Sequence, residues 1–234
     1  MIVVTFALPV ESSGLVALLQ EKTQAGSGDT RMIRGNLGKR PIGIFHTGIG
    51  RKISGRLDNF LLVAQPKVLI SSGFAGSIND RFGVGDLFLA QNFSDGQLLA
   101  FAEEILQKKM VRRGKLLTSP EMIGSAAQRD EIARAHGADA VDMETETIAQ
   151  ACAGRGIRVL SLRVISDTAR KPFPAPPDVL FDIERQRTNA GKLSLYLVTH
   201  PAGIWRLIRF ARQIARAREN LTNALVALLQ SNQL

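Results

Sequence analysis

The chain has 234 residues, of which 45% are hydrophobic and 22% are charged, a balance that is typical of a globular protein. A single cysteine, Cys152, excludes an intrachain disulfide, and the three widely separated histidines match no zinc-site spacing, so we expect no metal and no resident cofactor. The net charge of +9 favours an anionic substrate or an anionic membrane, whereas one tryptophan and one tyrosine argue against nucleic-acid binding.

The apolar runs of the sequence predict neither a secretory signal nor a membrane span. The first residues, MIVVTFALPVE, lack the basic start of a signal sequence, and no uncharged run reaches the length that a bilayer requires. We therefore expect a cytoplasmic protein.

Strands and helices alternate through the first half of the chain. We predict a strand at 2–7, a helix from Pro9 to about Lys22, a loop at 24–30, paired strands at 32–33 and 41–46, a helix at 53–64, and a buried strand at 67–72 that ends in a glycine turn at 73–76.

The second half continues this alternation and then changes composition. We predict a strand at 86–91, a flexible flap at 101–118, a helix at 123–135, and two further buried strands within 138–170. The proline-rich stretch 172–177 precedes a helical tail, so residues 170–234 are an appendage of one domain, 1–234, and not a second domain. The fold class is α/β, with a mixed, mainly parallel central sheet flanked by helices.

Carboxylates follow the two strands within 138–170. Asp142 and Glu144 come directly after Val141, and Asp167 follows the apolar run 159–165. Ligands of α/β proteins bind beyond the carboxyl ends of strands, and buried acids are costly unless they bind something, so we predict that these three side chains line a catalytic pocket. Two alternatives stay open, because Asp142 could simply cap the next helix and Glu144 could be an acid of its first turn.

Two other charged residues are candidates. Arg163 lies inside an apolar strand and requires an anionic partner, for which Asp167 is the nearest acid along the chain; a structural ion pair and a functional role both stay open. Glu11 follows the first strand, where it could be a catalytic base, although an acid in a helical first turn is the simpler interpretation.

Two glycine-containing segments could approach a ligand closely. Thr47, Gly48, Gly50 and Arg51 form a turn between a strand and a helix, where backbone N–H groups could hold a phosphate. Phe74, Ala75 and Gly76 belong to the second segment, 73–76. A plain turn is the alternative interpretation of each segment.

Five segments taken together resemble the superfamily of purine nucleoside phosphorylases and methylthioadenosine/S-adenosylhomocysteine nucleosidases. They are IVVTFALPVE, HTGIGR, LISSGFAGSINDRFGVGDLFLA, AVDMETETIA and LRVISDTA, and they occur in the family's order between residues 2 and 169. The resemblance implies an enzyme that cleaves the N-glycosidic bond of a purine nucleoside, with water or phosphate as the nucleophile and with phosphate as a co-substrate in the second case.

The resemblance also implies a role for each candidate residue. Asp167 would protonate N7 of the purine, Glu144 would bind the ribose hydroxyls, and Glu11 would orient or deprotonate an attacking water. Met143 would pack on the sugar, Arg163 and Ser166 would position the acids, and Asp142, Phe74, Ala75 and Gly76 would complete the substrate pocket. In a phosphorylase, phosphate would be held by Thr47, Gly48, Gly50 and Arg51.

Some positions depart from the family's pattern. Phe74 stands where nucleosidases commonly have a small polar residue, Asp142 replaces a glutamate, and the segment LTSPEMIG at 117–124 matches the base-contacting loop only loosely. Three features are similar to those of the hopanoid-associated phosphorylase branch, which acts on adenosylhopane. They are the Asp-Met-Glu segment, the proline-rich stretch and the basic last helix. The preferred substrate is therefore an adenosylhopane-type or other 5′-substituted adenosine.

The last helix also suggests a partner. Apolar residues recur at helical spacing in it, and Trp205, Arg209, Arg212 and Arg216 follow one another on another face. The basic helix 201–219 could lie on the inner face of a membrane, or it could pack its apolar side on the core and leave the arginines in solvent.

The resemblance further implies a homo-oligomer. The rival functions are a methylthioadenosine/S-adenosylhomocysteine nucleosidase and a non-catalytic nucleoside-binding or membrane-associated protein on the same fold.

Overall fold

The computed structural model describes residues 1–49, 53–170, 173, 179, 181–182, 187–188, 199 and 202–231. Its first half contains β1 (Ile2–Phe6), α1 (Pro9–Leu18), β2 (Gln20–Ala25), β3 (Met32–Leu37), β4 (Arg40–His46), α2 (Ile53–Ala64) and β5 (Val68–Ser77). Its second half contains β6 (Leu87–Ala90), α3 (Gly96–Leu106), β7 (Arg112–Gly114), β8 (Leu116–Thr118), α4 (Ala126–His136), β9 (Ala140–Asp142), α5 (Thr145–Ala153), β10 (Arg158–Asp167), β11 (Phe181–Asp182), β12 (Arg187–Thr188) and α8 (Ala202–Gln230).

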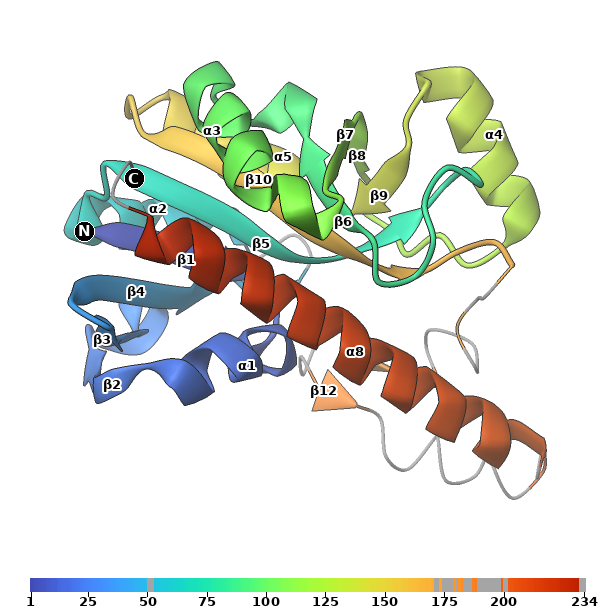
Figure 1. The fold of residues 1–234 in the computed structure, drawn as a ribbon, viewed down its shortest axis with the longest axis horizontal. Helices are drawn as coiled ribbons and strands as arrows, with labels where there is room; N and C mark the ends of the chain where they lie inside the picture. The colour runs from blue at the N-terminus through green and yellow to red at the C-terminus, as the bar shows by residue number, and fades with distance from the viewer. Residues whose placement is uncertain are drawn as a thin grey trace.

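One twisted sheet forms the centre of the molecule, in the strand order β2-β3-β4-β1-β5-β10-β6-β7, with β9 joined to β5 and β8 (Figure 1). Strands β4, β1, β5 and β10 run parallel, whereas β2 and β3 at one side and the β6–β10 pair are antiparallel. This arrangement confirms the predicted mixed, mainly parallel sheet. Because the four central strands are parallel, their carboxyl ends lie at one edge of the sheet, where a ligand site is expected.

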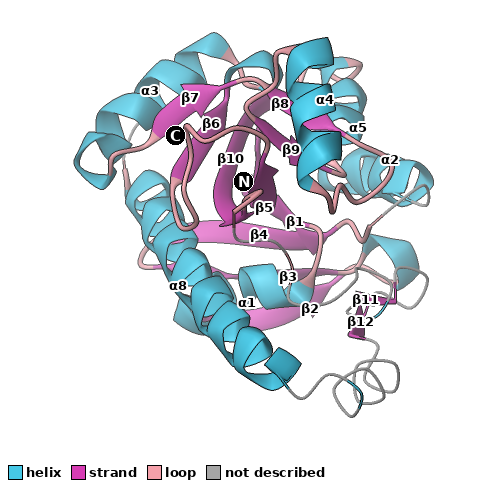
Figure 2. Cartoon of the chain, turned by 90° about the vertical axis from the view of Figure 1, so that its right-hand side faces the viewer, coloured by secondary structure: helices cyan, strands magenta, loops and turns pink. Residues whose placement is uncertain are grey.

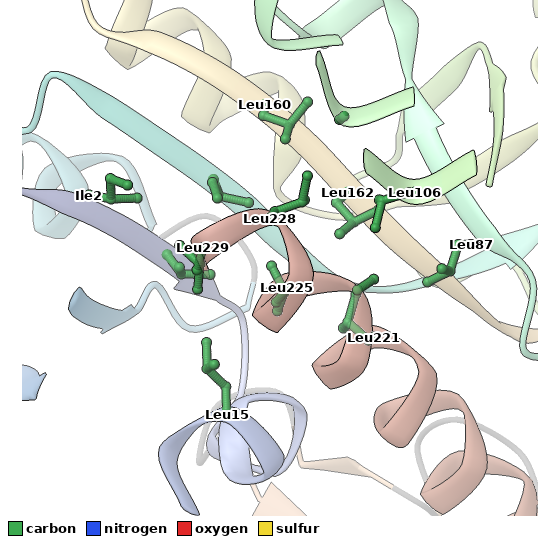
Figure 3. Packing of buried hydrophobic residues seen from close by; sticks show 14 of the residues in the cluster. Ile2, Leu15, Leu87, Leu106, Leu160, Leu162, Leu221, Leu225, Leu228 and Leu229 are labelled. Carbon is green, nitrogen blue, oxygen red and sulfur yellow. The ribbon is translucent and has the colours of Figure 1, made fainter. Parts of the chain in front are cut away.

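Helices cover both faces of the sheet (Figure 2). Helices α1, α3 and α8 pack on one face in the largest apolar cluster, and α2 and α5 pack on the other. The C-terminal half of α8 supplies Leu221, Leu225, Leu228 and Leu229, which point at the strands (Figure 3). Each buried leucine contributes about 1.5–3 kcal/mol, so this half of α8 is part of the core and not a detachable tail.

The N-terminal half of α8 extends beyond the sheet (Figure 1). Ile204, Trp205 and Ile208 are 45%, 77% and 38% exposed, so the apolar residues of the helix are not buried along its whole length. Pro201, expected in the first turn, lies outside the described residues. No helix in the described ranges combines the length and the apolar character needed to cross a bilayer.

Three predicted elements differ from the observed ones. Helix α1 ends at Leu18, not at about Lys22, because residues from Gln20 onward pair with β3 as an edge strand whose side chains are exposed. Strand β5 continues through the predicted glycine turn to Ser77, since β10 pairs with it as far as Gly76 and β9 pairs with its last residues. Pairing with two strands outweighs the turn preference of glycine.

The predicted flap at 101–118 is also wrong. Helix α3 buries Leu98, Phe101, Ala102 and Leu106 against the sheet, and β7 and β8 then add strands to the sheet through parallel pairing. These two strands have only three residues each, too few to show a recognisable periodicity in the sequence.

Candidate active site

A pocket of about 570 Å³ lies at the carboxyl edge of the central strands. Its size is within the range of about 300–1,000 Å³ that is usual for small-molecule sites. The three acids with predicted catalytic roles, Glu11, Glu144 and Asp167, all line it, and so do Phe74, Ala75, Gly76, Asp142, Met143 and Ser166. The fold thus brings together residues that are up to 156 positions apart in the chain (167 − 11).

Glu11 is held at the start of α1 with its carboxylate facing β5. Its Oε1 accepts a hydrogen bond of 2.9 Å from the Phe74 amide, and its Oε2 accepts one of 2.8 Å from the Leu8 amide. Gly73 has φ +151°, and a Cβ there would lie 2.9 Å from Glu11 Oε1, so the close approach requires glycine. Burial raises the pKa of Glu11, although the hydrogen bonds from the Phe74 and Leu8 amides oppose this shift. A carboxylate with a raised pKa is a stronger base.

Glu144 lies directly before α5 and is also buried. Burial and the neighbouring charges of Asp142 and Glu11 raise the pKa of Glu144 well above its ordinary value, and Arg163 opposes the rise. Three carboxylates thus share one buried region with one guanidinium. Such an excess of negative charge is suited to a substrate that becomes positively charged as it reacts.

Arg163 pairs with Asp142, not with Asp167 as predicted. Its Nε and Nη2 lie 3.1 and 3.0 Å from Asp142 Oδ2, and its Nη2 also donates to the Ser71 hydroxyl at 2.7 Å. Asp142 in addition accepts hydrogen bonds from the amide and hydroxyl of Thr145. The prediction chose Asp167 because it lies on the same strand as Arg163, whereas the actual partner, Asp142, comes from the separate strand β9. Asp142 therefore neutralises Arg163 and accepts a hydrogen bond from the first amide of α5, close to the capping role that its alternative interpretation anticipated, although the cap position itself is Glu144.

The partner of Asp167 is Arg129, which sequence reasoning missed. Arg129 Nη2 forms a buried ion pair with Asp167 Oδ2, and the Ser166 hydroxyl donates to Asp167 Oδ1 at 2.6 Å. Ser166 thus contacts the acid that it was predicted to position. An arginine in a largely polar helical segment has no distinctive sequence signal, so only the fold could identify Arg129.

In the predicted phosphate turn, the described amides of Thr47 and Gly48 already have partners. The Thr47 amide donates to the Phe6 carbonyl at 2.9 Å, and the Gly48 amide donates to the Ala7 carbonyl at 3.1 Å. The Thr47 hydroxyl also faces backbone carbonyls, those of Phe6 and Gly48. The described part of this turn is therefore a tight connection after β4, whereas Gly50 and Arg51 lie outside the described residues.

A second, much smaller cavity lies behind the carboxylates. Its volume is about 10 Å³, and Glu11 and Glu144 line both this cavity and the large pocket. Arg163 and Thr47 also line it, together with Thr5 and Ser72, whose buried hydroxyls have no hydrogen-bond partner among the described residues. A polar cavity of this size can hold about one water molecule.

The rest of the large pocket is apolar, and sequence reasoning did not identify this wall. Leu207, Phe210, Ala211 and Ile214 of α8 line it, together with Phe173, whose ring meets that of Phe210 edge-on at 5.7 Å between centroids. The helical spacing of Leu207, Ala211 and Ile214 was recognised, but it could not show that they face a cavity instead of the core. Within the described ranges, no three His, Cys, Asp or Glu side chains cluster as metal ligands.

Known proteins share this fold. The nucleosidase of Neisseria meningitidis that acts on 5′-methylthioadenosine and S-adenosylhomocysteine, solved with methylthio-immucillin-A, superimposes with a TM-score of 0.74 over 98% of both chains at 16% identity. A futalosine hydrolase mutant of Helicobacter pylori superimposes with a TM-score of 0.73 over 97% of both chains, also at 16% identity. These structures confirm the predicted fold class.

Sequence comparison finds relatives with the same named activity as the first of these structures. The 5′-methylthioadenosine/S-adenosylhomocysteine nucleosidase of Staphylococcus haemolyticus is 26% identical over 188 residues, which cover 66% of this chain and 82% of the relative. The prediction of an enzyme agrees with the activities named for these relatives. The profile of the phosphorylase superfamily matches residues 1–105 and 90–200, which together span most of the sequence. This chain therefore belongs to the phosphorylase superfamily, as its five sequence segments predict.

Proposed function

We propose that this protein hydrolyses the N-glycosidic bond of an adenine nucleoside that carries an apolar 5′-substituent. The observation that carries the proposal is the position of Glu11 and Glu144, two buried carboxylates that stand between a nucleoside-sized pocket and a polar cavity for one water. In this arrangement the sugar lies in the large pocket, and the attacking water comes from the adjoining small cavity, past the carboxylates that line both.

Water is the nucleophile that this geometry favours. The small cavity accommodates one water but is far too small for phosphate. The Thr47 and Gly48 amides, which a phosphorylase would need as donors, already bind backbone carbonyls. Glu11, with its raised pKa, accepts the proton of the attacking water. The hydrolase names of the relatives at 26% identity and of the solved structures support the same choice.

The other two acids act on the two halves of the substrate. Glu144 binds the ribose hydroxyls and stabilises positive charge as it develops on the sugar. Asp167 faces the same pocket and enters the step in its protonated form. It gives its carboxyl proton to N7 as the glycosidic bond breaks, so that adenine leaves as a neutral molecule and Asp167 becomes the carboxylate that pairs with Arg129. Its bond from Ser166 fixes one carboxylate oxygen, which leaves the other directed at Arg129.

The apolar wall supports a large apolar group at the 5′-position. Every α8 side chain that lines the pocket is apolar, so a charged amino-acid substituent such as that of S-adenosylhomocysteine has no described partner on this helix. Transfer of apolar surface into such a wall is favourable by about 25 cal/mol per Å². Adenosylhopane-type substrates fit this description, and methylthioadenosine is the smaller alternative.

We also propose contact with an anionic membrane and self-association. Trp205, Ile204 and Ile208 are exposed on the same half of α8 whose other side lines the pocket, and exposed Arg206, Arg209, Arg212 and Arg216 surround them. A lipid-linked substrate could then pass from the bilayer into the site.

Self-association is proposed for a different surface. Leu62 and Val63 of α2 are 62% and 71% exposed and offer an apolar surface for a second copy.

One assay tests the reaction. Purified protein is incubated with adenosine, methylthioadenosine and a 5′-alkylthio-adenosine with a long chain, each with and without phosphate, and free adenine is measured. We expect adenine release that does not depend on phosphate and is fastest with the long chain. Release only with phosphate would establish a phosphorylase instead, and no release from any substrate would refute the enzymatic proposal.

Light scattering of the same preparation tests self-association by measuring the mass of the particle in solution. The mass of a monomer would contradict self-association.

A further inference from the structure

Arg129 is the one fully buried side chain of helix α4. The other side chains of this helix are exposed or half-buried, yet the guanidinium of Arg129 is only 1% exposed. Its Nη1 donates to the Ser77 carbonyl at 2.6 Å, its Nη2 donates to the Ile123 carbonyl at 3.0 Å, and the same nitrogen pairs with Asp167. A single side chain therefore connects the end of β5, the loop before α4 and the end of β10.

The three connected segments all face the large pocket. Asp167 and Arg129 line it, and so do Met122 and Ile123 of the loop that Arg129 holds by its backbone. Gly76 completes the arrangement, because a Cβ there would lie 3.0 Å from Asp167 Oδ2 and 3.1 Å from Arg129 Nη1. The close fit means that any shift of Arg129 also shifts the carboxylate of Asp167.

A purely structural role is the competing explanation. Burial of an ion pair often contributes little net stability, and a well-packed apolar side chain would anchor a helix at lower cost. Arg129 Nε, moreover, is buried without a hydrogen-bond partner among the described residues, so the guanidinium is not fully satisfied by the protein alone. An anchor that only had to hold α4 would not need a charge at the pocket wall.

We propose that Arg129 is a positioning residue, which fixes Asp167 and the loop at 119–125 in one geometry around the departing base. The inference rests on the proposed function, since it assigns to Arg129 control of the group that protonates adenine. A positioned acid contributes about 10²–10⁴-fold to such a step, and a displacement of that acid loses much of this factor.

The test uses two leaving groups. Adenine needs a proton in order to leave, whereas 4-nitrophenolate leaves without one, so a ribosyl 4-nitrophenyl ether with the same 5′-substituent bypasses Asp167. We expect Arg129→Met to lower kcat for adenine release by about 100-fold and to change kcat for 4-nitrophenolate release by less than about threefold. Arg129→Lys should regain part of the loss. Asp167→Asn should show the same selectivity, and the double variant should be no slower than Asp167→Asn alone.

Arg134→Met, an exposed arginine of the same helix, is the matched control and should leave both rates unchanged. Equal losses with both leaving groups would make Arg129 only an anchor of α4 and overturn the inference. A wild-type protein that releases neither leaving group would refute the proposed function. In that case adenine binding, measured by calorimetry, decides the inference, because unchanged affinity in folded Arg129→Lys and Arg129→Met would reject it.

Discussion

At the scale of single residues, Glu144 and Asp142 are neighbours with opposite effects on stability. Asp142 is compensated by Arg163, whereas Glu144 is buried beside two other carboxylates that raise its pKa. A raised pKa in the folded state means that the folded protein retains a proton that the unfolded chain has lost. Stability therefore falls as the pH rises from the unfolded pKa of Glu, about 4.3, through the raised value. The proposed role of Glu144, which is to stabilise positive charge on the sugar, gives a reason for keeping a residue that carries this cost.

We therefore expect Glu144→Gln to increase the free energy of unfolding at neutral pH, because a neutral amide removes the repulsion from Asp142 and Glu11. The same change should lower adenine release by at least about 100-fold. Urea unfolding between pH 4 and pH 8 measures the effect on stability, and the gain over wild type should grow with pH. A variant less stable than wild type at neutral pH would contradict this view of Glu144.

Asp142→Asn is the matched control and should have the opposite effect. It removes the carboxylate that forms the buried ion pair with Arg163, so the free energy of unfolding should fall by about 3–5 kcal/mol. A loss of stability for Asp142→Asn and a gain for Glu144→Gln would together separate the supporting carboxylate from the substrate-facing one.

At the scale of elements, helix α8 has two functions along its length. Its C-terminal half is core, with Leu221 and Leu228 completely buried, and its N-terminal half is a pocket wall on one side and an exposed surface on the other. The rigid core half thereby fixes the position of the wall half. Changes to Leu207 or Ile214 should therefore alter substrate choice with little effect on the fold.

Ile214→Ser tests the wall. We expect it to raise KM for 5′-hexylthio-adenosine by about tenfold or more, because each apolar group lost from such a pocket is worth about 1–3 kcal/mol. KM for adenosine, which has no apolar 5′-substituent, should stay the same. Ile208→Ser, on the exposed side of the same helix, is the control and should change neither value. Equal changes for both substrates would place the 5′-substituent elsewhere.

At the scale of the whole molecule, the net charge of +9 is not distributed evenly between the pocket and the outer surface. The site itself is rich in carboxylates, whereas arginines gather on the exposed side of α8 beside Trp205. This separation is consistent with the two proposals, a transition state with positive charge in the pocket and an anionic partner at the basic surface.

Flotation with phosphatidylglycerol vesicles tests this surface. We expect the wild type to float and the Arg209/Arg212/Arg216 triple alanine variant to bind about 100-fold more weakly, since each arginine near an anionic surface contributes about 1 kcal/mol. The control triple variant Arg34/Arg134/Arg158 to alanine removes the same charge from exposed positions elsewhere and should bind nearly as well as wild type. If the wild type stays with the unbound fraction, the membrane proposal fails.

Much of the fold and of the site could be predicted from the sequence. Buried strands appear as apolar runs, so Glu144 and Asp167, which follow two of them, are predicted from the sequence to line the pocket that they do line. For Glu11, position alone favours an acid of a helical first turn, and only the family resemblance implies a role. These signals are local, because strand periodicity and the position of a residue after a strand depend only on nearby residues.

Only the tertiary structure decided which charges meet. Arg163 binds Asp142 from another strand, Asp167 binds Arg129 from a helix 38 residues earlier, and β5 stays extended through its glycines because two strands pair with it. The sequence by itself determined most of the strands, the resemblance to the superfamily and the candidate acids of the pocket. The ion pairs, the water-sized cavity and the apolar wall were decided by tertiary contacts, because each depends on distances between segments that are remote in the chain.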